Sequence, residues 1–97
     1  MTDYRPDNWI VIKIETDDKE SFYKVLGGWD GSWRMNSGIT KVEIDEDDIL
    51  FHGKSGSCYI CNKYTYGLQF NISGVFGQIN RHGVKMLDKD TDWLNLL

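Results

Sequence analysis

The sequence predicts a single, mainly β domain of the α+β class, in which five or six short antiparallel strands form a strongly bent sheet or a small SH3-like barrel with one C-terminal helix. Three observations support this fold class. Short alternating apolar runs recur along residues 8–63, ten glycines against one proline suit a chain of many turns, and a helical period appears only from Ile72 onward. The main alternative is an open antiparallel sheet with the helix lying across one face.

The 97 residues are treated as one domain, 1–97, because a chain of this size builds one modest core. We expect residues 1–8 to form a loose N-terminal arm and residues 88–97 to form an acidic and apolar tail. Trp93 in this tail is costly to leave in water, so it should pack back on the domain or meet a partner.

The strands that precede the centre of the chain are predicted at residues 8–15, 21–26, 32–36 and 39–44. The first has apolar side chains on both faces near its start, since Ile10 and Ile12 alternate with Trp9 and Val11. It should therefore be central or covered on both sides. The second strand is its expected hairpin partner, and the three glycines within residues 27–31 should break that strand sharply.

The element around which the chain is organised is a predicted β-hairpin over residues 48–63. Gly53-Lys54-Ser55-Gly56 supplies the glycines of its turn. With a turn of even length, alternation divides the side chains between two faces. One face then holds Ile49, Phe51, Cys58 and Ile60, and the other holds Leu50, His52, Tyr59 and Cys61.

The helix is predicted over residues 72–82, because its apolar residues follow the i, i+3, i+4, i+7 spacing of one helical stripe: Ile72, Val75, Phe76 and Ile79. Asn71 or Ser73 is a candidate N-cap, and Gly83 stands where a helix stop is expected. Gly74 and Gly77 weaken the helix by about 1 kcal/mol each relative to alanine. The helix should therefore depend on docking against the sheet, and residues 84–87 can add a last short strand.

The charge pattern argues against some partner classes. The net charge is −4, with eleven basic residues scattered among fifteen acidic ones. Nucleic-acid binding through phosphates and membrane anchoring both need clustered Lys and Arg, so nucleic acid is an unlikely partner and a membrane is not expected. The polar start and the lack of a run of about 20 apolar residues predict a cytoplasmic protein with reduced thiols.

Cys58 and Cys61 match the C-x-x-C spacing of zinc knuckles and redox motifs. In a strand, however, residues three apart point to opposite faces with Cα atoms about 10 Å apart. That separation excludes a disulfide or a shared metal, and no second cysteine pair completes four ligands. We interpret both cysteines as structural, with one of them in the core.

The histidines and the turn of the hairpin offer no convincing catalytic set. A Cys–His nucleophilic pair at His52 would need hydrogen-bond contact and a third orienting group, which the predicted hairpin does not supply. His82, near the helix end, fits a charge partner of the helix dipole better than a catalyst. Gly53-Lys54-Ser55 resembles the end of a P-loop, but Asp48 stands where that motif requires glycine. We predict no catalytic residues.

Two acidic runs imitate metal sites. Asp88, Asp90 and Asp92 match the first half of a calcium loop, but Trp93 replaces its required glycine. The run Asp45–Asp48 is better interpreted as a solvated turn that blunts a sheet edge against aggregation. We predict no metal site and no cofactor.

The aromatic residues are the strongest candidates for a binding surface. Trp29 and Trp33 bracket the glycine-rich corner, with Arg34 beside them, and Tyr64 and Tyr66 follow the central hairpin. Small β-barrels present such aromatics in loops as a peptide groove or a base-stacking platform. The alternative is that two or three of these rings complete a small core.

The sequence also resembles a group of small uncharacterised proteins carried by marine bacteriophages, including cyanophages. The similarity covers most of the chain and is carried by residues 7–14, 23–29, 32–39, 50–57 with Tyr59, 66–68 and 90–93. Members of the group have a longer segment around residues 27–32, which puts a shared site at Trp29 in doubt. The resemblance implies a phage accessory protein made inside an infected bacterial host, and it transfers no functional residue.

These observations favour a small non-enzymatic module that binds a host or phage protein. The alternative is a protein that binds single-stranded nucleic acid by aromatic stacking on the β surface. An enzyme would need a pocket that unites His52 with a carboxylate or with Cys61. The apolar tail also makes a homodimer plausible.

Overall fold

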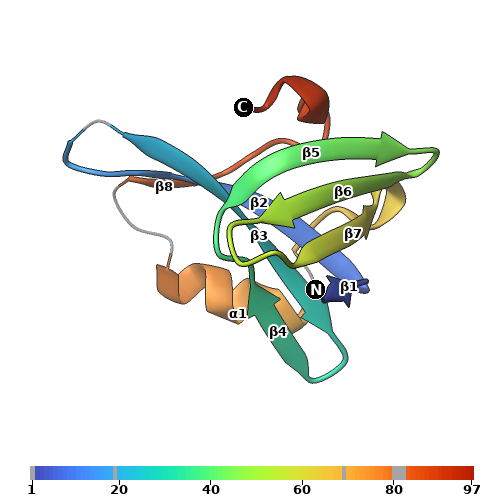
Figure 1. Ribbon diagram of the computed structural model, residues 1–97. Coiled ribbons are helices and arrows are strands. Elements are labelled where there is room, and N and C mark those ends of the chain that lie inside the picture. The colour runs from blue at the N-terminus through green and yellow to red at the C-terminus, as the bar shows by residue number, and fades with distance from the viewer. Residues whose placement is uncertain (1, 19, 69, 80–82) are drawn as a thin grey trace.

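The computed structural model describes residues 2–18, 20–68, 70–79 and 83–97, with side chains for all of these except 70–72 and 79. The described strands form two four-stranded sheets (Figure 1). Sheet A has the order β1-β7-β6-β5 and consists of β1 (Asp3–Tyr4), β7 (Cys58–Asn62), β6 (Asp48–Gly53) and β5 (Ile39–Asp45). Sheet B has the order β4-β3-β2-β8 and consists of β4 (Ser32–Met35), β3 (Ser21–Trp29), β2 (Asn8–Glu15) and β8 (Val84–Met86).

The prediction of a mainly β domain with one helix is confirmed. The SH3-like barrel of five or six strands is not, because neither described sheet closes on itself. The chain leaves sheet B at Met35 and enters sheet A at Ile39, so the strands divide into two layers. The helix α1 (Phe70–Ile79) lies against β3 and β4 of sheet B, as the open-sheet alternative expects for one face.

Both faces of β2 are covered, as its sequence predicts. Trp9 and Val11 belong to the core between the two sheets, with Val25 on β3 and Phe51 on β6. Ile10 and Ile12 point to the other face, where Leu26 and the helix residues Val75 and Phe76 pack against them. The helix therefore covers the outer face of sheet B with Val75 and Phe76, two residues of its predicted apolar stripe.

The glycines after the second predicted strand do not end it. Strand β3 continues through Gly27 and Gly28 to Trp29, and the chain turns at Gly31, whose φ is +78°. Gly27 is needed for a close approach, since a Cβ there would lie 3.0 Å from the Cβ of Pro6. The expectation of a sharp break at Gly27 was wrong, because β3 continues to Trp29 and Gly27 makes room for Pro6 of the N-terminal segment.

The central hairpin forms, but its two faces differ from the prediction. Its loop has an odd number of residues, because Gly53 N–H donates to Ser57 O at 2.9 Å and Gly56 adopts a φ of +90°. The register therefore shifts by one residue and every side chain of β7 changes face. Ile49 lies opposite Cys61, Phe51 opposite Tyr59, and His52 opposite Cys58.

Both ends of the chain are docked on the domain. Asp3–Tyr4 pairs in parallel with β7, and Cys58 N–H donates to Thr2 O at 2.9 Å, so the N-terminal arm is not loose. Trp93, in the short helix η2 (Trp93–Asn95), is 7% exposed and its ring lies 5.6 Å from that of Phe51. The expectation that Trp93 packs back is confirmed.

The helix α1 begins at Phe70, so Asn71 and Ser73 lie inside it and neither is its N-cap. Gly83 has a φ of +89°, but the described helix ends at Ile79, so Gly83 does not directly follow it. The role proposed for His82 lies outside the described residues. No helix in the described ranges has the length and apolar character that crossing a membrane requires.

Candidate functional site

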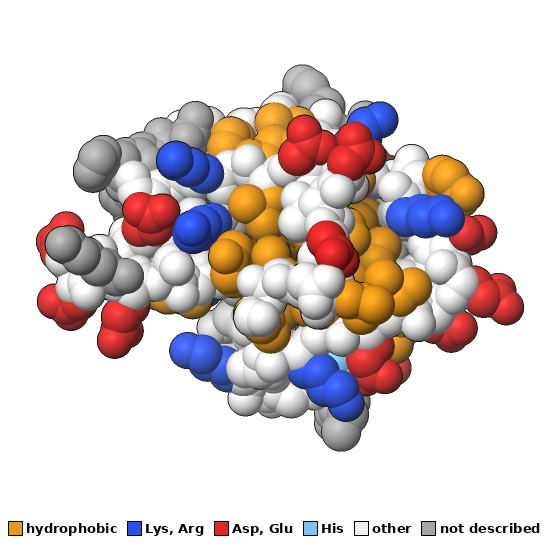
Figure 2. All heavy atoms as spheres, turned by 90° about the horizontal axis from the view of Figure 1, so that it is seen from above, with side chains coloured by type: hydrophobic (Ala, Val, Ile, Leu, Met, Phe, Trp, Pro, Cys, Tyr) orange, Lys and Arg blue, Asp and Glu red, His pale blue; other side chains and the backbone are white. Residues whose placement is uncertain are grey.

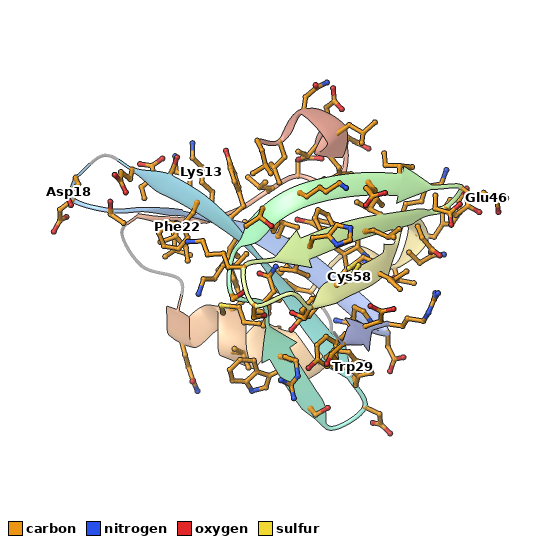
Figure 3. All side chains as sticks on the ribbon, viewed as in Figure 1. Lys13, Asp18, Phe22, Trp29, Glu46 and Cys58 are labelled. Atoms are coloured by element: carbon orange, nitrogen blue, oxygen red, sulfur yellow. The ribbon has the colours of Figure 1, made fainter. Side chains whose placement is uncertain are left out.

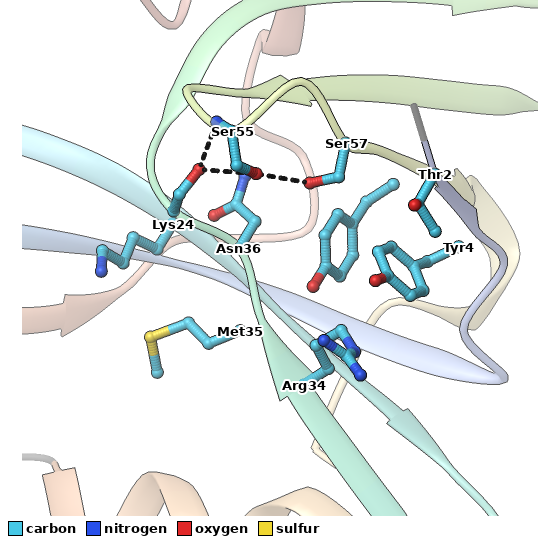
Figure 4. A pocket seen from close by; sticks show the side chains of 10 residues that line it. Thr2, Tyr4, Lys24, Arg34, Met35, Asn36, Ser55 and Ser57 are labelled. Carbon is cyan, nitrogen blue, oxygen red and sulfur yellow. Dashed lines mark hydrogen bonds between the residues drawn. The ribbon is translucent and has the colours of Figure 1, made fainter.

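An open pocket lies at one end of the interface between the two sheets (Figure 4). We call it the inter-sheet pocket. Its volume is about 570 Å³, within the range of sites that hold small ligands or side chains. It is lined by residues from the N-terminal arm, β3, β4, the following loop and the β6–β7 turn: Thr2, Tyr4, Lys24, Arg34, Met35, Asn36, Ser37, Ser55, Ser57 and Tyr59.

Asn36 lines this pocket and carries an unpaired donor, Nδ2, which is itself covered by neighbouring atoms. Its side chain is held by β3, because Oδ1 accepts a hydrogen bond from Val25 N–H at 2.9 Å. The residue is only 3% exposed, and its Nδ2 group has no hydrogen-bond partner. A buried donor without an acceptor costs about 1–3 kcal/mol. Among the described residues Asn8 Nδ2 is also such a donor, but only Asn36 lines the pocket.

Three serine hydroxyls surround the same point. Ser55 Oγ lies 3.3 Å from Ser37 Oγ and 3.1 Å from Ser57 Oγ, and Ser55 N–H donates to Ser37 Oγ at 3.0 Å. A Cβ placed on Gly53 would lie 3.0 Å from Ser37 Oγ and 3.6 Å from both Asn36 Nδ2 and Ser57 Oγ. The amide and the hydroxyls therefore lie close together around Gly53, where even a Cβ would be tightly packed.

Arg34 supplies the positive charge at the other side of the pocket. Its guanidinium carbon lies 4.8 Å above the ring of Tyr4, a cation–π contact that fixes its position. The Tyr4 ring packs at 5.0 Å against Tyr59, which the β6–β7 hairpin holds. Lys24 also lines the pocket, and in Figure 4 its side chain extends away from Arg34.

No carboxylate lines the pocket, although the molecule is acidic. The nearby basic residue Arg5 is already paired with Asp48 at 3.7 Å, whereas Arg34 has no ion pair within the described part of the chain. Burial raises the pKa of Tyr59 to about 12, so its hydroxyl stays protonated and can donate. The pocket is therefore rich in donors and locally positive.

The five residues predicted as a binding surface do not form one surface. Trp29 and Arg34 both contact Tyr4, at 6.2 Å between ring centroids and 4.8 Å respectively, and only Arg34 lines the pocket. Trp29 Nε1 donates to Arg5 O at 3.0 Å, which ties the arm to β3. Figure 3 shows Trp29 at the end of the molecule that carries the N-terminal arm.

The other three predicted residues lie elsewhere. Trp33 alternates with Arg34 on β4 and therefore shares a face with Met35, which packs on the helix side of sheet B. Trp33 is 51% exposed. Tyr64 is 74% exposed on the short helix η1 (Lys63–Thr65). Tyr66 is part of the core, with its ring 4.6 Å from that of Trp9.

Cys58 and Cys61 are both free and buried, and they face opposite sides of sheet A. Cys61 lies in the core between the sheets, where burial raises its thiol pKa well above the usual value. Cys58 lies opposite His52, and burial also raises its pKa. A protonated thiol is a poor nucleophile and a poor metal ligand.

His52 has a carboxylate partner that the predicted register did not supply. Its Nε2 lies 2.8 Å from Glu43 Oε1 on the outer face of sheet A, and this bond, followed by Lys41, lowers the pKa of Glu43. Cys58, His52 and Glu43 thus lie on neighbouring strands. No hydrogen bond joins the Cys58 thiol to His52 among the described contacts, and the raised thiol pKa opposes nucleophilic chemistry there.

The acidic runs form turns. Asp45 and Asp48 pair across a tight turn in which Glu46 has a φ of +54°, and Asp47 pairs with Lys63 at 3.2 Å. Asp88 Oδ1 accepts a hydrogen bond from Asp90 N–H at 2.8 Å. Within the described residues, no three His, Cys, Asp or Glu side chains are arranged to hold a metal ion.

Sequence reasoning missed most of the pocket. The prediction places Tyr4 in a loose arm, Asn36 at the end of the strand over residues 32–36, and Ser57 within the hairpin over residues 48–63. Ser55 belongs to the turn that resembles the end of a P-loop, and this turn joins two strands, as predicted. The side chain of Ser55 nevertheless lines the pocket. No local signal marks these residues, because only the pairing of distant strands brings them together.

Comparison of the chain with protein-family models, with curated proteins and with solved structures finds no significant match. The site must therefore be interpreted from its own geometry. The inter-sheet pocket offers hydrogen-bond donors and a cation, Arg34, that the ring of Tyr4 holds in place.

Proposed function

We propose that this chain is a small non-enzymatic module that binds a partner protein through the inter-sheet pocket. The observation that carries the proposal is the buried Asn36 amide, which has no partner and lies beside three serine hydroxyls in an open pocket. Such an amide gains its missing hydrogen bond when a ligand group enters.

Two features next to the pocket favour a protein as the partner. β4, which carries Arg34, is an edge strand of sheet B, so its outer backbone groups are open to an added strand. Trp33 on the same strand is 51% exposed and offers an apolar contact. An extended segment of a partner along β4 can thus place one side chain in the pocket.

The resemblance to phage proteins suggests where such a partner belongs. We propose that it is a host or phage protein that the module meets in the cytoplasm of an infected bacterium. The net charge of −4 is consistent with this choice, because a protein partner does not require the basic surface that nucleic acid requires.

Capture from a host lysate with paired variants tests the proposal. Arg34→Gln and Lys89→Gln each remove one positive charge, but Arg34 lines the pocket and Lys89 is an exposed residue outside it. We expect wild type and Lys89→Gln to retain the same protein, and Arg34→Gln to lose it. A protein retained equally by all three, or no retained protein, contradicts the proposal.

Single-stranded nucleic-acid binding by aromatic stacking remains the second candidate, because Trp33 and Tyr64 are 51% and 74% exposed. The two rings belong to β4 and η1, and the Tyr4 ring is occupied by Arg34, so they make a poor continuous platform. An oligonucleotide that quenches tryptophan fluorescence at low salt, with steep loss at higher salt, would favour this candidate over the first.

A further inference from the structure

We infer that the inter-sheet pocket binds an oxyanion, meaning a carboxylate or phosphate group that the partner protein presents. This inference rests on the proposed function, because it names the chemical group by which the partner would be recognised. The group would lie between the guanidinium of Arg34 and the donors formed by Asn36 Nδ2 and the serine hydroxyls.

The donor set requires an acceptor. Asn36 Nδ2 can only donate, and its rotation is fixed because Oδ1 is held by Val25 N–H at 2.9 Å. The hydroxyls of Ser37, Ser55 and Ser57 form a connected chain, with oxygen separations of 3.3 and 3.1 Å. Hydroxyls can rotate to donate, so amide and hydroxyls together form a cluster that suits an acceptor-only group.

The charges around the pocket select a negative acceptor over a neutral one. Arg34 lines the pocket, is positioned by the Tyr4 ring at 4.8 Å, and has no carboxylate partner among the described ion pairs. On β5 and β6, Glu43 pairs with His52 at 2.8 Å and Asp48 pairs with Arg5 at 3.7 Å. Charge-assisted hydrogen bonds to an oxyanion are about twice as strong as neutral ones.

The pocket is also formed before any ligand arrives. Lys54 N–H donates to Gly38 O at 3.1 Å and Ser55 N–H donates to Ser37 Oγ at 3.0 Å, so the β6–β7 turn is fixed to the loop after β4. The Tyr4–Tyr59 contact fixes the opposite wall. Preorganised donors lose little conformational entropy on binding.

The volume of about 570 Å³ exceeds what a single oxyanion fills, so the group should be attached to something larger. The open side and the neighbouring edge strand β4 suit a side chain carried by an extended segment of protein. A phosphorylated side chain and an aspartate or glutamate side chain present the same chemistry, and the test below distinguishes them.

A titration followed by ¹⁵N–¹H NMR tests the inference without knowledge of the partner. Inorganic phosphate and acetate are the two probes, added at constant ionic strength to the full chain. We expect saturable shifts at residues 34–37 and 53–57 and at the Asn36 side-chain amide. A stronger response to phosphate identifies a phosphorylated side chain as the natural group, and an equal or stronger response to acetate identifies a carboxylate.

Two variants and one control make the titration decisive. Asn36→Asp keeps the acceptor for Val25 N–H but replaces the donor with a negative oxygen, so it should abolish the saturable shifts. Arg34→Gln should weaken binding about ten-fold or more, and Lys89→Gln, with the same charge change outside the pocket, should bind as wild type. Because Arg34 is exposed, Arg34→Gln still gives a result if Asn36→Asp fails to fold.

Shifts that do not saturate, or that are equal in Arg34→Gln and Lys89→Gln, overturn the inference. The result also separates this inference from the proposed function. If neither probe binds and yet a partner is captured in an Arg34-dependent way, the oxyanion is wrong and the binding module stands. If the probes bind the pocket and no partner is captured, the oxyanion site stands and the proposed function falls.

Discussion

Tyr66 shows how one side chain can serve the core instead of a binding surface. Its hydroxyl donates to Leu87 O and accepts a hydrogen bond from Val11 N–H at 3.3 Å, so it joins β2 to the chain after β8. Its ring packs on Trp9 and Trp93, at 4.6 and 5.7 Å between centroids. The aromatic pattern alone does not distinguish Tyr66 from the exposed Tyr64.

Stability should fall at alkaline pH because of this tyrosine. Burial raises the pKa of Tyr66 to about 12, whereas an unfolded tyrosine ionises near pH ~10. The unfolded state therefore releases its proton first, and the stabilisation present below pH ~10 is lost as the pH rises toward 12, by about 1.4 kcal/mol per pH unit. Urea unfolding at several pH values measures this slope.

Tyr66→Phe should lower the free energy of unfolding at pH 7 by about 1–3 kcal/mol, because Leu87 O and Val11 N–H lose their partner. The variant should also reduce the alkaline slope. Tyr64→Phe is the control and should change stability at pH 7 by less than about 0.5 kcal/mol, since Tyr64 is 74% exposed. If the loss of stability at alkaline pH is as steep in Tyr66→Phe as in wild type, Tyr66 is not the group that causes it.

The two cysteines give a second test at the residue scale. Burial raises the pKa of both thiols, and Cys58 and Cys61 point to opposite faces of β7. We expect slow labelling of the native protein by a thiol reagent at neutral pH, rapid labelling of both in denaturant, and no intramolecular disulfide under mild oxidants. Fast native labelling of either thiol would contradict the described burial.

At the scale of single elements, the sequence predicted most of the strands and missed the register of the central hairpin. Alternation locates a strand but not the parity of the turn that follows it. Gly53 pairs with Ser57, which leaves an odd loop, and so Tyr59 and Cys61 enter the core in place of Ile60 and Cys58. One residue of turn length thus decides which residues can line the pocket.

The helix is the element that the sequence marks as weak, and its glycines make that testable. Gly77 lies in the exposed interior of α1, and a Cβ there would meet nothing within 4 Å. Gly77→Ala should therefore raise the free energy of unfolding by about 0.5–1 kcal/mol, measured by urea denaturation. A loss of stability would mean that this face of the helix is covered.

Gly83→Ala is the matched control for that prediction. Gly83 has a φ of +89°, and a Cβ there would lie 2.9 Å from Glu15 O. The N–H of Glu15 also donates a hydrogen bond to Gly83 O at 2.7 Å. The same substitution should therefore destabilise the protein by more than about 1 kcal/mol. Equal effects at the two sites would show that backbone conformation does not govern them.

At the scale of the whole molecule, the two sheets could not be foreseen from alternation alone. Five or six short strands are compatible with one bent sheet or with two layers, and the choice depends on where the chain changes sheet. Here that change falls at residues 36–38, and Trp93 returns from the tail to fill the core between the layers. The inter-sheet pocket exists because the strands divide into two sheets, and this division determines which residues line it.

The exposed apolar residues of the molecule are the basis for predicting a homodimer. Ile44 on β5 and Leu94 and Leu97 near the C-terminal end are 48%, 58% and 64% exposed, and η2 lies against β5. Figure 2 shows hydrophobic side chains gathered in the middle of the face seen from above. Sedimentation equilibrium should give twice the 11.3 kDa chain mass, with Leu94→Lys shifting it toward the monomer. A monomer at high concentration would exclude the homodimer.

The central claim is that a partner enters the inter-sheet pocket, and photo-crosslinking from inside the pocket tests it most directly. A photoreactive residue replaces Ser55 in one variant and Asp18 in the other; Figures 3 and 4 place Asp18 at the tip of the β2–β3 hairpin and Ser55 in the pocket wall. The account predicts a partner crosslink from position 55 that excess phosphate or acetate suppresses, and none from position 18. Equal crosslinking from both positions, or from position 18 alone, would contradict it.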